Sequence, residues 1–267
     1  MNNAIGVFDS GVGGLTVARE IMRQLPNETI YYFGDVKNCP YGDKTKEEII
    51  KNTDRAVKFL IDKGVKLVVL ACNTATAAAL EYLQSKYEVP IIGVVQPGAR
   101  RAIQATENNK VLVLGTKFTA NSKVYDIEIE NINSDIIVFD KACPAFVPFI
   151  ESEGNLDKEA TKKLISDTLG KTNTLGVDTV VLGCTHYPIL KKDIEDYYGN
   201  NIKVISSGRE AAREVSTVLG YAKLHQKKLN KKEHRFFISE ESDNFNSIAS
   251  KWVKSNLTRS GVTKEPA

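Results

Sequence analysis

The amino-acid sequence predicts an α/β protein made of two similar, doubly wound domains, each built on a mostly parallel sheet. Short, continuous apolar runs alternate with longer helix-compatible stretches along the chain, which is typical of βαβ units. Two of these runs, LVVLACNTA (67–75) and TVVLGCTHY (179–187), share one pattern, and in each a cysteine follows the apolar residues. Matching segments in the two halves of one chain indicate an internal duplication with weak sequence identity.

The first half has four predicted strands, separated by helices as βαβ units require. We expect the strands at AIGVF (4–8), TIYYFG (29–34), KLVVL (66–70) and PIIGVV (90–95). Helices are expected between them, at 15–25, 45–63 and 75–87. Thr45 and Glu48 have the spacing of a capping box, and Gly64 is placed to end the second helix.

The second half repeats this series of elements. KVLVLGTKFT (110–119) aligns with AIGVFDSGVG, which places Leu114 on Phe8 and Thr116 on Ser10. DIIVFDKACP (135–144) aligns in the same way with TIYYFGDVKN, and NIKVISSG (201–208) provides the last strand. From this repeat we expect a first domain of 1–95 plus 207–267 and a second domain of 96–206.

The segment after the repeat carries no motif. We expect a helix at 209–226, a basic and apolar-poor linker at 227–234, a strand-like run at 235–240 and a weak helix at 243–255. This segment is expected to return to the first domain. The final residues, TRSGVTKEPA (258–267), have the composition of a frayed end.

The charge balance of the chain excludes several classes of partner. Its 36 basic and 33 acidic residues give a formal net charge of +3, which is too small to indicate binding to nucleic acid or to a membrane surface. No apolar stretch approaches the roughly 20 residues of a membrane span. The N-terminal MNNAIGVFDSG has neither the basic nor the apolar region of a signal peptide, so we expect a cytoplasmic protein.

The four cysteines are expected to be free thiols, because the cytosol is reducing. No CxxC pair occurs, and of the three histidines only His186 lies beside a cysteine, so we expect no metal site. Cys39 and Cys143 each precede a proline in a loop. We assign both mainly to packing, although Cys39 also has a position from which it can line a cleft.

The strongest candidates for chemistry are Cys72 and Cys184. Each follows a strand at the carboxyl end of a parallel sheet, where open α/β folds bind ligands. A helix N-terminus expected directly after each cysteine would lower the thiol pKa from about 8.5 and offer N–H groups to a substrate carboxylate. Two opposed thiols can move protons on and off the two faces of one carbon. The alternative is that each buried cysteine is only a small apolar residue.

The Gly-rich turn DSGVGG (9–14) matches neither GxGxxG nor the P-loop pattern, so it predicts no nucleotide site. Asp9 can instead bind an ammonium group or a thiol, and Ser10 a carboxylate, unless the turn merely caps the next helix. His186 can assist proton transfer or be structural. Further candidates near strand ends and matched loops, several of which are equally suited to cap helices, are Asp35, Asn73, Thr74, Thr116, Thr119, Glu151 and Thr185.

These motifs together resemble those of the glutamate racemases, in the cofactor-independent aspartate/glutamate racemase superfamily. The blocks DSGVGG, CPYG, CNTA and GCTHYP occur in this order and extend the resemblance to about residue 220. The resemblance implies two α/β domains related by a pseudo-twofold axis, with the small-molecule substrate glutamate in the cleft between them. It also implies that there is no cofactor and no metal, that the enzyme is a homodimer, and that it supplies D-glutamate for peptidoglycan.

The resemblance also assigns the site residues. Cys72 and Cys184 are the acid and base thiols, Cys72 for D-glutamate and Cys184 for L-glutamate, with Asp9 and His186 as their helpers. Four pairs of neighbouring residues would contact the substrate: Asp9 with Ser10, Tyr41 with Gly42, Asn73 with Thr74, and Thr185 with His186.

Racemisation of an amino acid without pyridoxal phosphate makes specific demands on such a site. Preorganised donors must stabilise the charge that develops on the α-carbon and its carboxylate, and the α-carbon must be held between the two thiols. One thiolate would take the proton while the other thiol protonates the opposite face. The pair would therefore titrate together and give a bell-shaped pH–rate profile.

Two other functions stay open on the residues alone. A hydrolase or transferase would use Cys184 as a nucleophile with help from His186. We expect side chains so close along a strand end to point apart, which argues against that pairing. A non-catalytic protein would bind small acidic ligands and use its cysteines only for packing. Glutamate is favoured over aspartate by the resemblance alone, because one methylene gives little discrimination.

Overall fold

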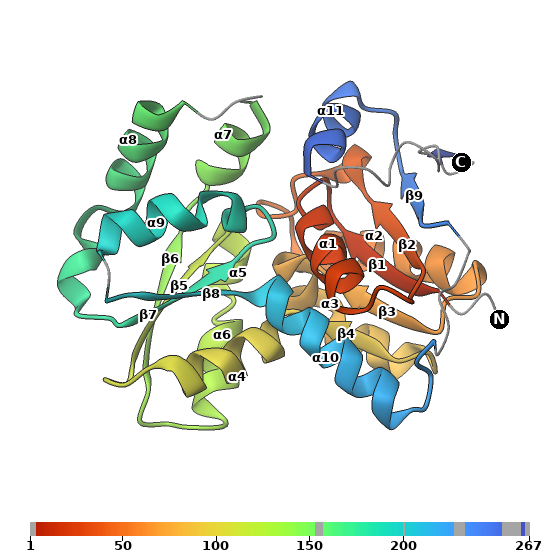
Figure 1. Cartoon of the computed structure of the whole chain (residues 1–267), viewed down its shortest axis with the longest axis horizontal. Coiled ribbons are helices and arrows are strands. Elements are labelled where there is room, and N and C mark those ends of the chain that lie inside the picture. The colour runs from red at the N-terminus through yellow and green to blue at the C-terminus, as the bar shows by residue number, and fades with distance from the viewer. Residues whose placement is uncertain (1–3, 153–156, 200, 227–232, 253–262, 265–267) are drawn as a thin grey trace. The chain divides into compact units, whose positions relative to one another are not determined.

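The protein contains two parallel sheets with helices packed against them, which confirms the predicted α/β class (Figure 1). The structure, a computed structural model, describes residues 4–152, 157–199, 201–226, 233–252 and 263–264. The chain divides into two compact units, Met1–Val94 with Gly208–Ala267 and Val95–Ser207. Among the described residues, no helix has the length and apolar character needed to cross a membrane.

The first unit has a six-stranded sheet in the order β10-β9-β2-β1-β3-β4. Its strands are β1 (Ile5–Asp9), β2 (Ile30–Gly34), β3 (Leu67–Leu70), β4 (Ile91–Gly93), β9 (Arg235–Ile238) and β10 (Thr263–Lys264). Its helices are α1 (Leu15–Gln24), α2 (Lys46–Asp62), α3 (Asn73–Lys86), α10 (Ser207–Tyr221, its first residue in the second unit), α11 (Asp243–Trp252) and the short 3-10 helix η1 (Val36–Asn38).

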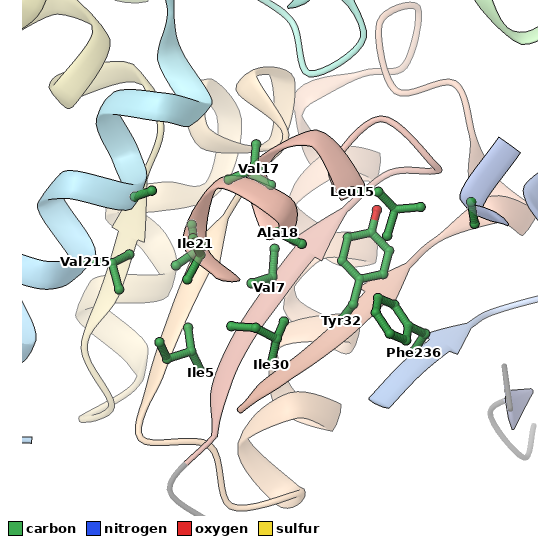
Figure 2. Packing of buried hydrophobic residues seen from close by; sticks show 14 of the residues in the cluster. Ile5, Val7, Leu15, Val17, Ala18, Ile21, Ile30, Tyr32, Val215 and Phe236 are labelled. Atoms are coloured by element: carbon green, nitrogen blue, oxygen red, sulfur yellow. The ribbon is translucent and has the colours of Figure 1, made fainter. Parts of the chain in front are cut away.

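Alternate residues of the central strands bury their side chains on one face of this sheet. Ile5, Val7, Ile30 and Tyr32 belong to one cluster with apolar residues of α1, α10 and α11 (Figure 2). The strands are apolar on both faces because α2 and α3 pack against the sheet as well. This burial explains why the continuous apolar runs predicted the strands so well.

The second unit has a four-stranded sheet in the order β6-β5-β7-β8. Its strands are β5 (Lys110–Gly115), β6 (Ile137–Ala142), β7 (Thr179–Gly183) and β8 (Lys203–Ser206). Its helices are α4 (Val95–Ala105), α5 (Lys117–Asn121), α6 (Val124–Glu130), α7 (Phe146–Ser152), α8 (Lys158–Leu169) and α9 (Lys191–Tyr198), with the 3-10 helices η2 (Gly170–Leu175) and η3 (Tyr187–Leu190).

The two sheets share one topology around their central strands. The order β2-β1-β3-β4 in the first sheet corresponds to β6-β5-β7-β8 in the second. The strand register agrees as well, since Phe8 pairs with Leu70 and Leu114 pairs with Leu182. Cys72 and Cys184 each follow such a leucine by two residues. The thiols therefore occupy equivalent places at the carboxyl ends of equivalent strands.

Several local predictions are confirmed and two boundaries are wrong. The Thr45–Glu48 capping box is formed, and Gly64 takes a positive φ of 80° after α2. The strand expected at 90–95 ends at Gly93, because the buried Val95 begins α4. The helix expected at 209–226 ends at Tyr221.

The segment after α10 extends the first sheet, since β9 pairs with β2 in parallel. Most of the linker expected at 227–234 and most of the frayed end expected at 258–267 lie outside the described residues. The end of the helix expected at 243–255 also lies outside them, beyond Trp252.

Candidate functional site

Cys72 is the N-cap residue of α3, as the strand–cysteine–helix pattern predicts. Its sulfur accepts a hydrogen bond from the N–H of Ala75 at 3.4 Å, and its thiol lies 3.7 Å from the Ser10 hydroxyl oxygen. The side chain is only 6% exposed. A thiolate at this position is stabilised by the N–H of Ala75 and by the dipole of a 14-residue helix.

Asp9 is the last residue of β1 and is fully buried. Its carboxylate accepts a hydrogen bond from the N–H of Gly11 at 3.0 Å, which forms an Asx-type turn. This turn does not cap α1, because the N-cap of that helix is Gly14 and no side chain caps it. A Cβ on Gly14 would lie 2.3 Å from the Asp9 Cβ, so only glycine leaves room for this carboxylate.

Tyr41 is buried in the same unit and is held by Asp35. Its hydroxyl donates to Asp35 Oδ2 at 2.6 Å, and the same carboxylate accepts bonds from Asn38 and Arg55. Burial and the Asp35 charge hold the pKa of Tyr41 far above its usual range, and Cys72 contributes in the same direction. The Tyr41 hydroxyl thus stays protonated with its proton committed to Asp35. The Tyr41 hydroxyl can therefore meet a ligand only as an acceptor.

The remaining polar candidates of the first unit lie at the start of α3. Asn73 and Thr74 are its first two residues, and both side chains are buried next to Cys72 in sequence. The surroundings of Cys72 in the first unit therefore combine a thiol, a helix N-terminus, hydroxyl and amide side chains, and the buried carboxylate of Asp9.

The surroundings of Cys184 differ from the prediction. No α-helix starts after it, because the chain forms the 3-10 helix η3 with Pro188 in its first turn, and α9 begins only at Lys191. Tyr187 explains this local fold, since its fully buried hydroxyl donates to the carbonyl oxygens of Gly115 at 3.1 Å and Cys143 at 2.9 Å. These bonds tie the turn to the carboxyl ends of the neighbouring strands.

The expectation that Cys184 and His186 point apart is wrong as well. Cys184 and His186 are two positions apart, so even a continued strand would direct both side chains to one face, and after Gly183 the chain turns and brings them together. The Cys184 sulfur lies 3.8 Å from His186 Nδ1, and His186 Nε2 lies 2.7 Å from Glu151 Oε1. Glu151, on α7, is therefore a partner of the His186 imidazole within the second unit.

His186 is buried between a thiol and a carboxylate. Burial alone lowers the pKa of this histidine, but the Cys184 sulfur and the Glu151 carboxylate outweigh it and raise the pKa to about 10. At neutral pH the ring is therefore an imidazolium whose two N–H groups face Cys184 and Glu151. An adjacent cation of this kind stabilises a thiolate.

The other cysteines and threonines have supporting places. Cys143 is fully buried, and burial raises its pKa to about 12, so it remains a thiol, as its assignment to packing requires. Cys39 lies beside the Asp9 turn, since its sulfur would be 3.1 Å from a Cβ on Gly11.

The threonine candidates of the second unit lie near strand ends. Thr116 caps α5 and pairs with Thr119, while Thr185 is buried and follows Cys184 in the sequence. Within the described residues, no three His, Cys, Asp or Glu side chains are grouped to hold a metal ion.

Comparison with known proteins places this arrangement in a family. A profile of Asp/Glu/Hydantoin racemases matches residues 5–215 of the chain, which include both cysteine turns. The chain belongs to this family. It is therefore an isomerase of the racemase class, and the resemblance noted from its motifs is confirmed.

Close relatives of this racemase cover nearly its whole length. The chain is 48% identical over 254 residues to a glutamate racemase of Staphylococcus haemolyticus, covering 95% of this chain and 96% of the relative. A crystal structure of glutamate racemase isoform RacE1 from Bacillus anthracis matches with a TM-score of 0.93 and 39% identity, covering 98% of this chain and 97% of that one. A glutamate racemase from Francisella tularensis, solved in complex with D-glutamate, matches with a TM-score of 0.90 and 32% identity over 99% and 98% of the two chains.

Sequence reasoning missed two tyrosines of this racemase that hold the site loops in place. Tyr187 stands inside the GCTHYP block, where a large aromatic residue beside a candidate catalytic turn is a usable signal. Tyr32 donates to the Gly11 carbonyl at 2.6 Å from the buried strand β2. In the sequence, Tyr32 can be recognised only by its position in the strand alternation, because the YYFG run (31–34) has the composition of an ordinary core strand.

Proposed function

We propose that this racemase interconverts L-glutamate and D-glutamate with two cysteines, Cys72 and Cys184, as its acid and base. The relatives that match most of its length support the substrate, since they are named glutamate racemases. The equivalent placement of the two thiols after β3 and β7 carries the two-base mechanism. A scheme with one base would not require a second buried thiol at the matching strand end.

The different surroundings of the thiols suit the two roles. In the direction from L to D, Cys184 as thiolate takes the α-proton, and the electron pair stays on the α-carbon and its carboxylate. His186, charged and oriented by Glu151, stabilises that thiolate beforehand. Cys72 as thiol then protonates the opposite face, and the α3 N-terminus stabilises the thiolate that remains. The reverse direction exchanges the roles.

The residues beside the thiols would stabilise the developing charge. Ser10, Asn73, Thr74 and Thr185 offer hydroxyl and amide donors, which the proposal assigns to the substrate carboxylates. Asp9 is fully buried and ends the central strand, so we assign it to the ammonium group or to assistance of Cys72. The mechanism needs no electron sink beyond these groups, and the proposal therefore includes no cofactor.

The wider role follows from the same family relationship. The proposal includes a cytoplasmic homodimer that supplies D-glutamate for peptidoglycan synthesis. These features are supported by the resemblance to glutamate racemases over nearly the whole chain.

The decisive experiment is proton exchange in D₂O. The purified protein, without added cofactor, is incubated with L-glutamate while the α-proton is followed by NMR and the loss of optical activity by circular dichroism. Deuterium at the α-carbon together with decay of the rotation supports the proposal. Exchange of L-aspartate but not of L-glutamate would move the substrate assignment to aspartate, and exchange of neither would contradict the assignment.

Substitution of each cysteine tests the two-base scheme. Cys72→Ala is expected to abolish racemisation, because no acid remains on the second face. Cys184 is retained in this variant, so L-glutamate is expected to exchange its α-proton slowly without inversion. Cys184→Ala should show the mirror result with D-glutamate. Substantial two-way turnover by either variant would contradict the scheme, and Cys143→Ala, at a buried thiol outside the scheme, is the matched control.

A further inference from the structure

The residues that follow the racemase motifs pack against the loops of the Cys72 half of the site. Strand β9 pairs with β2, with Phe236 opposite Tyr32 and Ile238 opposite Gly34. Directly after β9, the N–H of Ser239 donates to the Gly34 carbonyl at 3.1 Å, so the pairing continues to the point where β2 ends. The C-terminal segment, which carries no motif, thus reaches the carboxyl ends of the strands, where the candidate site residues lie.

Tyr32 connects this segment with the Asp9–Gly14 loop. Its ring packs near two aromatic rings of the segment, with centroids 6.1 Å from Phe236 and 6.3 Å from Phe245. Figure 2 shows the ring beside Phe236, with the hydroxyl oxygen directed toward Leu15 at the start of α1. That hydroxyl donates to the carbonyl of Gly11 at 2.6 Å.

The packing around this hydrogen bond leaves little freedom. A Cβ on Gly14 would lie 2.9 Å from the Tyr32 hydroxyl as well as 2.3 Å from the Asp9 Cβ. A Cβ on Gly34 would lie 2.9 Å from the Gly11 carbonyl and 3.2 Å from the Phe245 ring. The Asp9–Gly14 loop is therefore closely packed against Tyr32 and Gly34 of β2, and Gly34 in turn packs against Phe245 of α11. Ser10, within this loop, contacts the Cys72 thiol at 3.7 Å.

A second bond reaches the loop that carries Asp35 and Tyr41. The Ser239 hydroxyl accepts a hydrogen bond from the N–H of Lys37 in η1 at 3.0 Å. Asp35 lies next to this 3-10 helix, and its N–H donates to the Asp9 carbonyl at 3.0 Å. Both loops of the Cys72 half are thus fixed by residues of one C-terminal segment.

We propose that Tyr32 is a positioning residue for the Cys72 half of the site, and that the segment from Arg235 to Trp252 holds it in place. The inference rests on the proposed racemase function. Tyr32 touches neither of the reacting atoms in this scheme. It acts by fixing the loop that carries Asp9 and Ser10, and a small displacement of such a loop is enough to slow proton transfer.

Isotope effects distinguish this role from a general loss of folding. An α-deuterium on D-glutamate is removed by Cys72, and an α-deuterium on L-glutamate is removed by Cys184. If the Cys72 step alone becomes slower, it dominates the barrier in both directions. The isotope effect on kcat/KM then rises for D-glutamate and falls toward unity for L-glutamate.

Tyr32→Phe removes the hydroxyl and keeps the ring. We expect kcat/KM to fall by about 10- to 100-fold, with the isotope effects shifted as described. Tyr31→Phe is the matched control, because Tyr31 is the adjacent residue of β2 and packs against Phe237, on the side of the sheet away from the loop. This control is expected to keep wild-type rates and isotope effects.

Glu151→Gln serves as the opposite comparison, since it slows the Cys184 step and should shift the two isotope effects in the reverse sense. Phe245→Leu and Ser239→Ala act on the C-terminal segment and are expected to shift them in the Tyr32→Phe sense. They keep the test decisive if Tyr32→Phe does not fold. Wild-type isotope effects in Tyr32→Phe, Phe245→Leu and Ser239→Ala would overturn the inference. A wild-type enzyme that does not turn over glutamate would instead overturn the proposed function.

Discussion

At the scale of single residues, the two thiols differ in what stabilises their charged forms. Cys72 receives the N–H of Ala75 at the start of α3, so a helix terminus supplies the positive potential. Cys184 is followed by a 3-10 turn, and in the proposed scheme the cation of His186, 3.8 Å from its sulfur, takes that role. A change at His186 or Glu151 should therefore affect one half-reaction more than the other.

Glu151→Gln tests the contribution of the carboxylate to the histidine charge. Burial works to lower the pKa of His186, and Cys184 and Glu151 raise it to about 10 in the native protein. Without the carboxylate charge this pKa falls, so the imidazolium is lost at a lower pH. We expect the alkaline limb of the kcat/KM profile to move to lower pH, and an unmoved limb would show that Glu151 does not hold the charge.

The same substitution has a consequence for stability. Because the folded pKa of His186 is raised, its contribution to the free energy of unfolding is complete below the unfolded value of 6.5. The contribution is lost as the pH rises through about 10. Urea titrations across this range should show a smaller loss of stability in Glu151→Gln than in the wild type. Glu159→Gln, at an exposed pair with Lys162, is the matched control.

At the scale of elements, a buried ion pair fixes the chain after α10. Lys66 Nζ lies 2.6 Å from Glu28 Oε2, and both side chains are almost fully buried. Lys66 also donates to the Leu224 carbonyl at 2.6 Å, and Glu28 Oε1 accepts from the N–H of Gln226 at 2.8 Å. These bonds satisfy backbone groups that a longer α10 would have paired internally, which explains why the helix stops before the predicted end.

Breaking this pair should be costly. Glu28→Gln leaves the Lys66 charge buried without its counter-charge, and such losses cost about 3–5 kcal/mol. The double variant Glu28→Gln/Lys66→Met removes both charges and should recover a large part of that loss. Urea unfolding measures both values. Glu20→Gln, at an exposed pair with Arg23, is expected to change stability by no more than about 0.5 kcal/mol. A Glu28→Gln variant as stable as this control would show that the pair is dispensable.

Element prediction succeeded where burial and local chemistry act together. The strands β1, β2, β3, β5 and β7 lie within continuous apolar runs because both faces of each sheet are covered. Their ends were harder to place. Val95 suits a strand by composition, yet it starts α4, because its side chain packs into the core of the second unit. The turn after Cys184 depends on the long-range bonds of Tyr187, which no local pattern contains.

At the scale of the whole molecule, the residues of the candidate site were easier to name than the bonds between them. The cysteines and the flanking polar residues follow strand ends, which a sequence reveals directly. The contacts of Tyr32 with Gly11 and of Ser239 with Lys37 join segments far apart in the chain. Such contacts arise from the order of strands in the sheet, so they appear only once the topology is known.

Thermodynamics constrains how any variant of this racemase can behave. The two enantiomers of glutamate have equal free energies in an achiral solvent, so the equilibrium constant is unity. The two directions must then share one value of kcat/KM in every variant. An asymmetry between the Cys72 and Cys184 halves is therefore visible only in kcat, in KM or in the isotope effects of each direction.

The two-base scheme predicts an overshoot when the reaction starts from one enantiomer in D₂O. L-glutamate loses its proton to Cys184 and receives deuterium from Cys72, so the product is labelled while the remaining substrate is not. The labelled D-glutamate returns more slowly because a C–D bond must break. The circular dichroism signal should therefore pass through zero, change sign and then decay, and D-glutamate should give the mirror curve. A single base acting on both faces would label substrate and product alike, so a monotonic decay from both enantiomers would contradict the assignment of one thiol to each face.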